Sequence, residues 1–306
     1  MKKQEHPYRI LLYYKYVKIE EHEEYAKLHL KFCKSIGVKG RILVAEEGIN
    51  GTISGSIDQT DAYIYAMRMD PRFKDMQYKI DEADEHAFKK LYVRPRSEIV
   101  TMDLEQDLDP NVITGKRLKP KEFLEELQKD NVVIIDARND YEYDIGHFRN
   151  AIRPDVQNFK QFPEWIKKNE ELLKDKKILA YCTGGVRCEK FTGLLVREGF
   201  KDVNQLKGGI ISYGKHPDTR GKLFDGKCYV FDERISVRIN FTDEDVVVGK
   251  CKICNEACDH YRNCINDNCH DQFICCEKCE EKFGGACSKE CGELAAGKLK
   301  VVTENA

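Results

Sequence analysis

The stretch Lys177-Ile-Leu-Ala-Tyr-Cys182-Thr-Gly-Gly-Val-Arg187-Cys188 decides how the centre of the chain folds. Its apolar first part predicts a buried strand, and residues 189–197 have the spacing of an amphipathic helix. A tight loop joins the two, and its pair of glycines lets several backbone N–H groups converge on one point. We therefore predict a strand, a loop and a helix, with Cys182 as the first residue of the loop.

The position of Cys182 is one where a thiol should ionise near neutral pH. The start of the following helix contributes partial positive charge, and Arg187 contributes a full positive charge. Both lower the pKa of a thiol, and the thiolate is its nucleophilic form. Cys188 lies at the start of the same helix. It is either a disulfide partner that resolves an intermediate on Cys182 or a small buried core residue.

Strands alternate with helices over residues 123–218, which predicts a parallel sheet. The predicted strands are Val132–Asp136, Lys177–Tyr181 and Asp202–Leu206. In such a sheet, ligands bind at the C-terminal ends of the strands, where Asp136 and Cys182 both lie. Asp136 is therefore a candidate catalytic residue that orients the loop or the substrate, or else it caps the helix that follows.

Residues 1–98 have the order β-α-β-β-α-β of a ferredoxin-like, or acylphosphatase-like, domain. Its first helix is predicted over residues 22–36, and its second is capped by Ser56 or Asp58. This scaffold serves many functions and identifies none of them. The irregular residues 99–122 are predicted to be a linker to the central domain.

A basic segment, Phe88-Lys-Lys-Leu-Tyr-Val-Arg-Pro-Arg96, closes the first domain. Its four cations and Tyr92 lie in a predicted strand, a pattern suited to following a phosphate backbone. The candidate substrate-binding residues of this segment are Lys89, Lys90, Arg94 and Arg96. The alternative is a solvated edge strand protected by its lysines, and Pro95 is compatible only with an edge.

The C-terminal residues 219–306 are rich in cysteine: ten of the fourteen cysteines of the chain fall between Cys251 and Cys291. Two Cys-x-x-Cys pairs offer thiolates at the spacing of a tetrahedral site, so we predict structural zinc in a zinc-ribbon-like region. The candidate ligands are Cys251, Cys254, Cys264, Cys269, Cys276 and Cys279. An iron–sulfur cluster is the alternative.

The composition fits a soluble, cytoplasmic protein of two or three domains. The chain has 306 residues, of which 41% are hydrophobic and 34% charged. No apolar run is long enough to span a membrane, and we expect no signal peptide, so the cysteines should be reduced. The net charge of −2 does not by itself indicate a nucleic-acid partner. No motif for an organic cofactor is present.

The loop length discriminates between two kinds of cysteine enzyme. Four residues separate Cys182 from Arg187, whereas cysteine phosphatases have five and rhodanese-type sulfurtransferases have four. The shorter loop suits a sulfur atom better than a phosphate, so persulfide chemistry is favoured. The substrate would then contact the loop residues Thr183, Gly184, Gly185 and Val186.

Residues 132–213 resemble a rhodanese domain through Ile135-Asp-Ala-Arg138, Gly146-His-Phe148 and Lys207-Gly-Gly-Ile210. Three further stretches narrow the resemblance to one family of rhodanese-domain proteins. Together, Ala45–Gly55, Arg94–Thr101 and Cys182–Glu189 resemble the bacterial tRNA uridine-34 hydroxylases, which contain a rhodanese domain. The resemblance covers nearly the whole chain.

That resemblance implies an enzyme that hydroxylates C5 of the wobble uridine of tRNA to 5-hydroxyuridine. It further implies molecular oxygen as co-substrate and the anticodon region of tRNA as partner. It also implies that Cys182 is the residue that forms a persulfide, with the sulfur supplied by a donor protein or a small molecule. Two alternatives remain: a sulfurtransferase that passes sulfane sulfur to a thiol acceptor, and a non-enzymatic binding adaptor.

Overall fold

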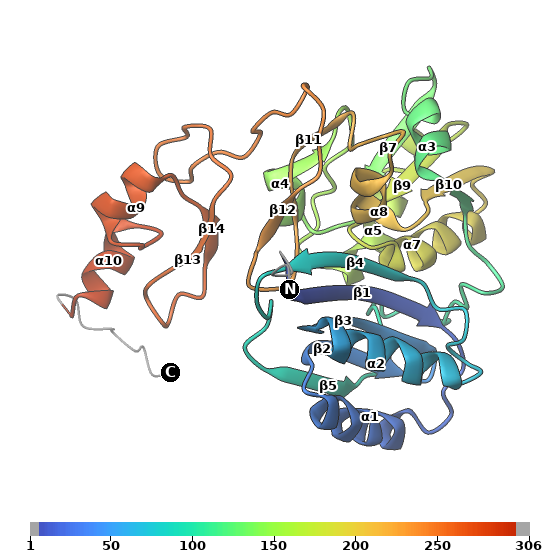
Figure 1. The fold of residues 1–306 in the computed structure, drawn as a ribbon. Helices are drawn as coiled ribbons and strands as arrows, with labels where there is room; N and C mark the ends of the chain where they lie inside the picture. Colours follow the sequence, from blue (N-terminus) through green and yellow to red (C-terminus); the bar gives the residue numbers. More distant parts are fainter. Residues whose placement is uncertain (1–5, 298–306) are drawn as a thin grey trace, which may run out of the picture.

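The computed structural model describes residues 6–297; residues 1–5 and 298–306 of the predicted terminal domains lie outside the described part. Figure 1 shows three parts: an N-terminal α/β domain, a central α/β domain above it, and a Cys-rich region that stands to one side. The predicted mixed α/β class is confirmed.

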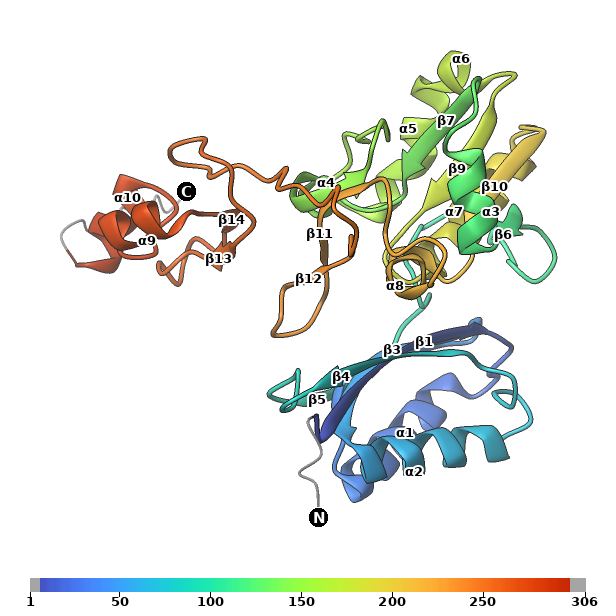
Figure 2. The ribbon, with the colours of Figure 1, turned by 45° about the horizontal axis from the view of Figure 1, so that its top comes forward.

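The N-terminal domain is a five-stranded sheet with two helices. Its elements are β1 (Tyr8–Tyr16), α1 (His22–Ile36), β2 (Lys39–Ala45), β3 (Gly48–Ser56), α2 (Ile57–Met69), β4 (Tyr78–Ala83) and β5 (Leu91–Pro95). The strand order is β4-β1-β3-β2-β5. The first four strands have the ferredoxin-like order, and β5 extends the sheet by pairing parallel to β2. Both helices cover one face, and the other face is turned toward the central domain (Figure 2).

Local sequence sets the ends of these helices. Gly37 adopts a left-handed conformation, with φ of 80°, and its N–H donates to the carbonyl oxygen of Cys33 to end α1. The hydroxyl of Ser56 accepts from the N–H of Gln59, whose side chain accepts in return from the N–H of Ser56. This capping box starts α2. Pro95 is the last residue of the edge strand β5, where its missing N–H costs nothing.

The central domain is built on the predicted parallel sheet. Its first elements are β6 (Lys116–Leu118), α3 (Pro120–Glu126), β7 (Val132–Asp136), α4 (Asp140–Ile145), β8 (Gly146–Phe148), η1 (Phe159–Gln161), α5 (Phe162–Lys168), α6 (Glu170–Leu173), β9 (Lys177–Tyr181) and α7 (Val186–Arg197). β10 (Asp202–Leu206) and α8 (Gly209–Lys215) follow. The strand order is β6-β10-β9-β7, all parallel. The segment expected as a linker thus supplies β6, which pairs with β10 through Leu118 and Leu206.

A second, antiparallel sheet follows the central domain. β11 (Phe224–Tyr229) pairs with β8 on one side and with β12 (Ser236–Arg238) on the other. The Cys-rich region contains β13 (Tyr261–Asn263), β14 (Gln272–Ile274), α9 (Glu277–Phe283) and α10 (Lys289–Ala295). Its buried core consists of cysteines and Phe273, so apolar burial contributes little to its stability.

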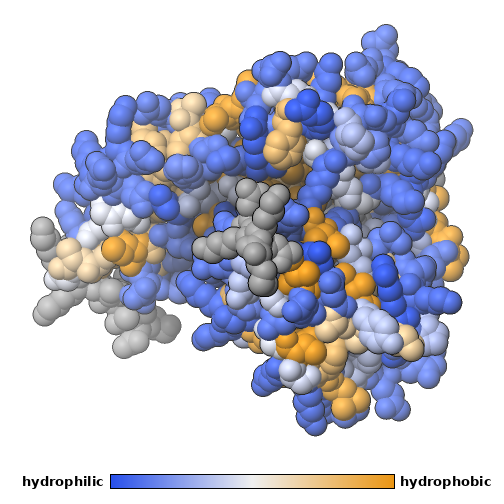
Figure 3. All heavy atoms as spheres, viewed as in Figure 1, coloured by the Kyte–Doolittle hydropathy of each residue, from blue (hydrophilic) through white to orange (hydrophobic). Residues whose placement is uncertain are grey.

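Several large apolar side chains are exposed to solvent. On the face drawn in Figure 3, the residues are mainly hydrophilic, and hydrophobic residues gather mostly over the N-terminal domain. Leu28 on α1 and Tyr65 and Met69 on α2 are among the exposed apolar side chains. Within residues 6–297, no helix has the length and apolar character needed to cross a membrane.

Candidate active site and cysteine clusters

The loop that begins at Cys182 is folded around the sulfur atom. The N–H of Gly185 donates to Sγ of Cys182 at 3.1 Å. Gly185 has φ of 103°, a conformation that favours glycine. Behind the loop, the N–H of Ile210 donates to the carbonyl oxygen of Cys182 at 3.0 Å. A side chain on Gly209 would come within 2.6 Å of the loop carbonyl oxygens, which explains the glycine there. The Lys207–Ile210 stretch therefore fixes the back of the loop.

This environment stabilises the thiolate of Cys182. Burial by itself raises the pKa of this thiol, because its side chain is 0% exposed. A hydrogen bond from the Cys188 thiol, the charge of Arg187, and the N–H groups of Cys188 and Gly185 outweigh burial and lower the pKa to about 6. Burial and the neighbouring thiolate raise the pKa of Cys188 well above its usual value. Cys188 therefore stays protonated and acts as the donor.

The pH dependence of Cys182 alkylation tests this assignment. With iodoacetamide, we expect the rate at Cys182 to rise with pH, with a midpoint near pH 6, since only the thiolate reacts. In the Cys188→Ala variant the midpoint should move to higher pH, because a donor to the thiolate is lost. Peptide mass spectrometry of timed samples at about pH 5 to 9 measures both. A wild-type midpoint near that of an unperturbed thiol would contradict the assignment.

Arg187 is held beside the loop by a buried carboxylate. Its Nη1 and Nη2 atoms donate to Oε1 and Oε2 of Glu142 at 2.5 and 2.8 Å, and Nη2 also lies 3.2 Å from Oγ1 of Thr183. Glu142 is fully buried, and although burial raises its pKa, the charge of Arg187 brings the net shift below its usual value. The pair fixes one cation at the side of the thiolate.

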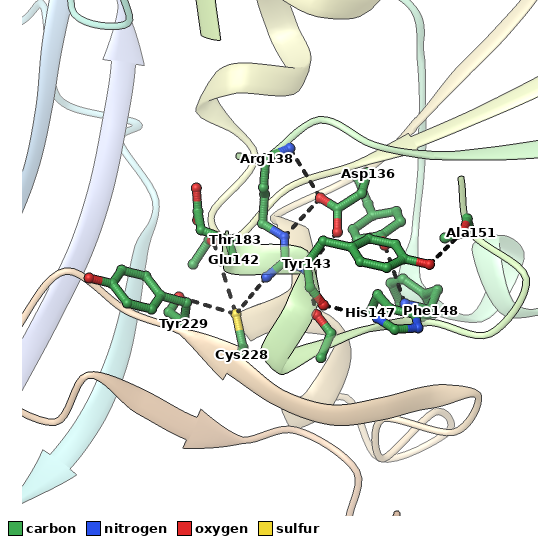
Figure 4. Close-up of polar contacts among 12 residues, drawn as sticks. Asp136, Arg138, Glu142, Tyr143, His147, Phe148, Ala151, Thr183, Cys228 and Tyr229 are labelled. Carbon is green, nitrogen blue, oxygen red and sulfur yellow. Dashed lines mark hydrogen bonds and ion pairs between the residues drawn. The ribbon is translucent and has the colours of Figure 1, made fainter. Parts of the chain in front are cut away.

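Asp136 belongs to a second buried ion pair, with Arg138. Its carboxylate accepts from Nε and Nη2 of Arg138 at 2.8 and 2.6 Å, and Arg138 also donates to the carbonyl oxygen of Gly146. Figure 4 shows this pair together with Glu142 and Thr183 around the sulfur of Cys228. The carboxylate of Asp136 thus contacts Arg138 rather than the sulfur of Cys182. It positions the strand ends that carry the loop.

The contacts of His147 indicate a structural role for this residue. Its ring stacks on that of Tyr143, with centroids 3.8 Å apart, and its Nδ1 lies 2.9 Å from the carbonyl oxygen of Tyr143. Figure 4 shows the two rings side by side. These contacts fix the bend between α4 and β8.

The N-terminal domain covers the front of the loop, which the sequence did not reveal. The hydroxyl of Tyr14 donates to Oε1 of Glu189 at 3.0 Å, and that of Tyr16 donates to the carbonyl oxygen of Val186 at 3.2 Å. Leu12 packs against the core of the central domain and lies next to Gly184. Strand β1 therefore closes the space in front of Cys182.

Lys79 on β4 adds a cation from the same side. Its Nζ lies 5.2 Å from the centre of the Tyr14 ring. Burial lowers the pKa of Lys79 to about 8, and the negative charges of Cys182 and Glu189 oppose that shift. The thiolate is thus flanked by cations from both domains.

Comparison with known families covers the three parts of the chain. Residues 8–99 match the UPF0176 acylphosphatase-like domain, residues 119–216 the rhodanese-like domain, and residues 225–292 the rhodanese C-terminal domain. Curated relatives match over nearly the full length. The tRNA uridine(34) hydroxylases of Bacillus licheniformis and Bacillus cytotoxicus are each 59% identical over 93% of this chain and 88% of their own, and that of Bacillus velezensis is 57% identical over 94% and 89%. The chain belongs to the tRNA uridine(34) hydroxylase family.

Solved structures match a smaller part of this family member. A rhodanese-like domain protein of Staphylococcus aureus is 25% identical and aligns with 33% of this chain and 94% of its own. Its TM-score of 0.28 carries no structural argument.

The basic strand of this family member lies apart from the loop. Lys89, Lys90, Arg94 and Arg96 are exposed on or beside β5, at the far edge of the N-terminal sheet. Two strands separate β5 from β1, so at the usual strand spacing the two are about 14 Å apart. These cations therefore do not contact the sulfur of Cys182.

A buried lysine joins the two domains beside the loop. Nζ of Lys190, on α7, lies 2.6 Å from Oε2 of Glu47 and 2.6 Å from Oε2 of Glu98, and its side chain is 0% exposed. Glu47, at the β2–β3 turn, also accepts from the N–H of Ile99. Neither Lys190 nor this role of Glu47 is predicted from the sequence, because the partners lie far apart along the chain.

Replacing Lys190 by methionine should destabilise the domain interface. The change leaves two nearly buried carboxylates without their cation, and breaking a buried pair in this way costs about 3–5 kcal/mol. We expect a clearly lower urea midpoint for unfolding. The matched control is Lys168→Met, which removes an exposed pair with Glu164 and should change stability by less than about 0.5 kcal/mol. Equal midpoints for the two variants would refute the interface role.

The cysteines of the C-terminal region form two groups of four. In each group all sulfur atoms lie within 4.8 Å of one another. The first group is Cys251, Cys254, Cys276 and Cys279, and the second is Cys264, Cys269, Cys287 and Cys291. The sulfur–sulfur distance is 3.7 Å between Cys254 and Cys276, and 3.6 Å between Cys269 and Cys287. Four thiolates bound to zinc at about 2.3 Å are separated by roughly 3.8 Å, so both groups fit the ion.

The two Cys-x-x-Cys pairs come together as their spacing indicates. The second group adds Cys287 and Cys291, which were not among the predicted ligands. Their Cys-x-x-x-Cys spacing, one residue longer, was the available signal. Cys258 and Cys275 belong to neither group.

Proposed function

We propose that this family member hydroxylates C5 of uridine-34 in tRNA to 5-hydroxyuridine, with molecular oxygen as co-substrate and Cys182 as the reactive residue. The 59% identity to curated tRNA uridine(34) hydroxylases over 93% of the chain supports the reaction. The stabilised thiolate of Cys182 supports the assignment of the residue. We further propose that the protein is cytoplasmic, because its proposed substrate is tRNA.

The loop is suited to hold an anion on the sulfur of Cys182, either as thiolate or as persulfide. The N–H of Gly185 and the Cys188 thiol bind that sulfur, and Arg187 adds charge at its side. Glu142 positions Arg187, and Asp136 positions Arg138. A persulfide on Cys182 requires a sulfane sulfur donor, either a protein persulfide or a small molecule such as thiosulfate, whose outer sulfur passes to the Cys182 thiolate while the rest of the donor leaves as a thiolate or as sulfite. Thr183 and the loop backbone would contact the substrate.

The zinc ions would have a structural role. The eight thiolates of the two groups would hold two ions and would thereby fix a region with little apolar core. All four ligands of each ion would come from the protein, which is the arrangement of structural rather than catalytic zinc sites.

Because Cys182 is fully buried under β1, a uridine reaches it only after this contact opens. A small thiol acceptor would meet the same barrier. The sulfurtransferase alternative predicts brisk turnover of thiosulfate with a thiol and no RNA, whereas we expect slow turnover.

The proposed function is tested in a strain whose tRNA lacks 5-hydroxyuridine. Expression of the full chain should produce 5-hydroxyuridine or its derivatives at position 34, measured by mass spectrometry of nucleosides and of the anticodon fragment. Unmodified uridine-34 in cells that contain the folded protein would refute the function.

A further inference from the structure

An exposed aromatic ring lies next to the Cys182 loop. Phe231, in the turn between β11 and β12, is 45% exposed. The guanidinium carbon of Arg187 lies 5.9 Å from the centre of its ring, and the ring of Tyr229 lies edge-on at 5.1 Å. Tyr229 is in turn packed edge-on against Tyr141 and Tyr261. A fixed base of aromatic rings therefore supports one ring that is open to solvent.

Phe231 also borders the space that leads to the loop. A small cavity lies between the two domains, with Phe231, Thr183, Leu12 and Lys79 in its wall. Its volume is about 40 Å³, which is room for only a few water molecules. A nucleobase cannot enter this cavity as it stands. The ring of Phe231 thus lies at the edge of a cavity that reaches the loop at Thr183, the residue after Cys182.

Cations lie across from the ring, on the uncovered part of the N-terminal sheet. Arg41 pairs in register with Tyr92, and Leu43 with Arg94, so these side chains share the face opposite α1 and α2. The guanidinium carbon of Arg94 lies 5.0 Å from the centre of the Tyr92 ring. The N–H of Glu233, two residues after Phe231, donates to the carbonyl oxygen of Ala87 at 3.0 Å, which holds the turn of Phe231 against the segment that leads into β5.

The acidic residues of the same turn are paired. Asp232 accepts from Arg234, at 2.8 Å for Nε and 2.7 Å for Nη2. Glu233 lies 3.1 Å from Nζ of Lys89. Their charges are thus largely compensated and do not repel a phosphate strongly. Rings that stack on bases, next to cations that bind phosphates, are the usual features of a site for single-stranded RNA.

We propose that Phe231 is the ring on which a base of the anticodon loop stacks at the approach to Cys182, while Arg41 and Arg94 bind the phosphates of the same strand. The inference rests on the proposed function and names the residues that receive the single-stranded RNA. Phe231 is thereby a substrate-positioning residue, and Tyr229 and Arg187 fix the orientation of its ring.

Binding of an anticodon stem-loop RNA to the full-length, zinc-loaded protein tests this proposal. Phe231→Leu should weaken binding roughly ten- to hundredfold, the range for loss of one base–aromatic stack, and Phe231→Trp should restore it. Phe231→Leu should leave the salt dependence of the binding constant unchanged, whereas Arg41→Gln should reduce its slope by about 0.7. The matched control is Phe241→Leu, because Phe241 is 43% exposed and has Arg238 at 5.4 Å from its ring centre.

Two results would overturn the proposal: wild-type affinity in Phe231→Leu, or an equal loss in Phe231→Leu and Phe231→Trp. Unchanged thermal unfolding of the variants shows that the effect does not come from misfolding. The assay measures binding without turnover, so it separates this inference from the proposed function. Normal hydroxylation together with unaffected RNA binding in Phe231→Leu would refute only the stacking role of Phe231. Absent hydroxylation by the wild type would refute only the proposed hydroxylase function.

Discussion

Replacing Cys182 by serine is expected to abolish hydroxylation of uridine-34, with a loss of roughly 10⁴-fold or more, the scale on which removal of a reactive nucleophile acts. Serine nearly matches cysteine in size, so the buried loop should keep its shape. Its hydroxyl does not ionise near neutral pH, and no anion then forms where the N–H of Gly185 and the charge of Arg187 would stabilise it. The measurement is the amount of 5-hydroxyuridine in tRNA of the complemented strain.

The matched control for this prediction is Cys33→Ala. Cys33 is also a buried free cysteine, but it lies on α1 in the core of the N-terminal domain. This variant should keep wild-type levels of 5-hydroxyuridine if it remains folded. Wild-type modification in Cys182→Ser would remove the cysteine from the reaction, whatever the control shows.

Removal of zinc is expected to unfold the Cys-rich region and leave the two α/β domains folded. Structural zinc in small thiolate sites contributes about 10–16 kcal/mol of apparent binding free energy near neutral pH. The region has few apolar contacts to replace it, because its core cluster consists largely of the ligands themselves. Circular dichroism and limited proteolysis, before and after chelation, should show loss of residues 251–291 alone. A region that stays protease-resistant without metal would contradict the structural role.

Metal analysis of single variants tests which cysteines bind. We expect two zinc ions per chain in the wild type and one in Cys276→Ser and in Cys287→Ser, since each variant breaks one group. Cys258→Ser is the control, because Cys258 lies in the same region but outside both groups, and it should retain two. Iron in place of zinc, with visible absorption, would favour the iron–sulfur alternative.

The elements of the N-terminal domain follow from short-range signals. The helix predicted over residues 22–36 is α1 in the structure, because Gly37 ends it, and Ser56 caps α2. The order β-α-β-β-α-β along the chain was predicted as well, and the structure has it from β1 to β4. The short strand β6 was not, because its three residues are defined by pairing with β10 rather than by a local pattern.

The candidate active site was predictable only on its rhodanese side. The loop from Cys182 to Arg187 is continuous in the sequence, and its chemistry follows from residue types and spacing. The side of the site that the N-terminal domain covers depends on contacts such as Tyr14 with Glu189 and Glu47 with Lys190, which join residues far apart along the chain. Lys190 lies on a helix of ordinary amphipathic spacing, and no local pattern marks it as a buried bridge between domains.

The contact between the domains has a functional consequence. It buries the reactive sulfur under β1 and leaves the cations of β2 and β5 exposed toward the other edge of the same sheet. The N-terminal domain therefore both limits access to Cys182 and offers a surface for RNA beside it.

The most direct test of the whole account is the origin of the added oxygen atom. Cells that express the wild-type chain are grown under isotopically heavy O₂, and the anticodon fragment of tRNA is analysed by mass spectrometry. We predict that the heavy isotope appears on uridine-34 with the wild-type chain and that no hydroxylation occurs with Cys182→Ser. An unlabelled hydroxyl group, with its oxygen taken from water instead of O₂, or unchanged labelling in Cys182→Ser, would contradict the account.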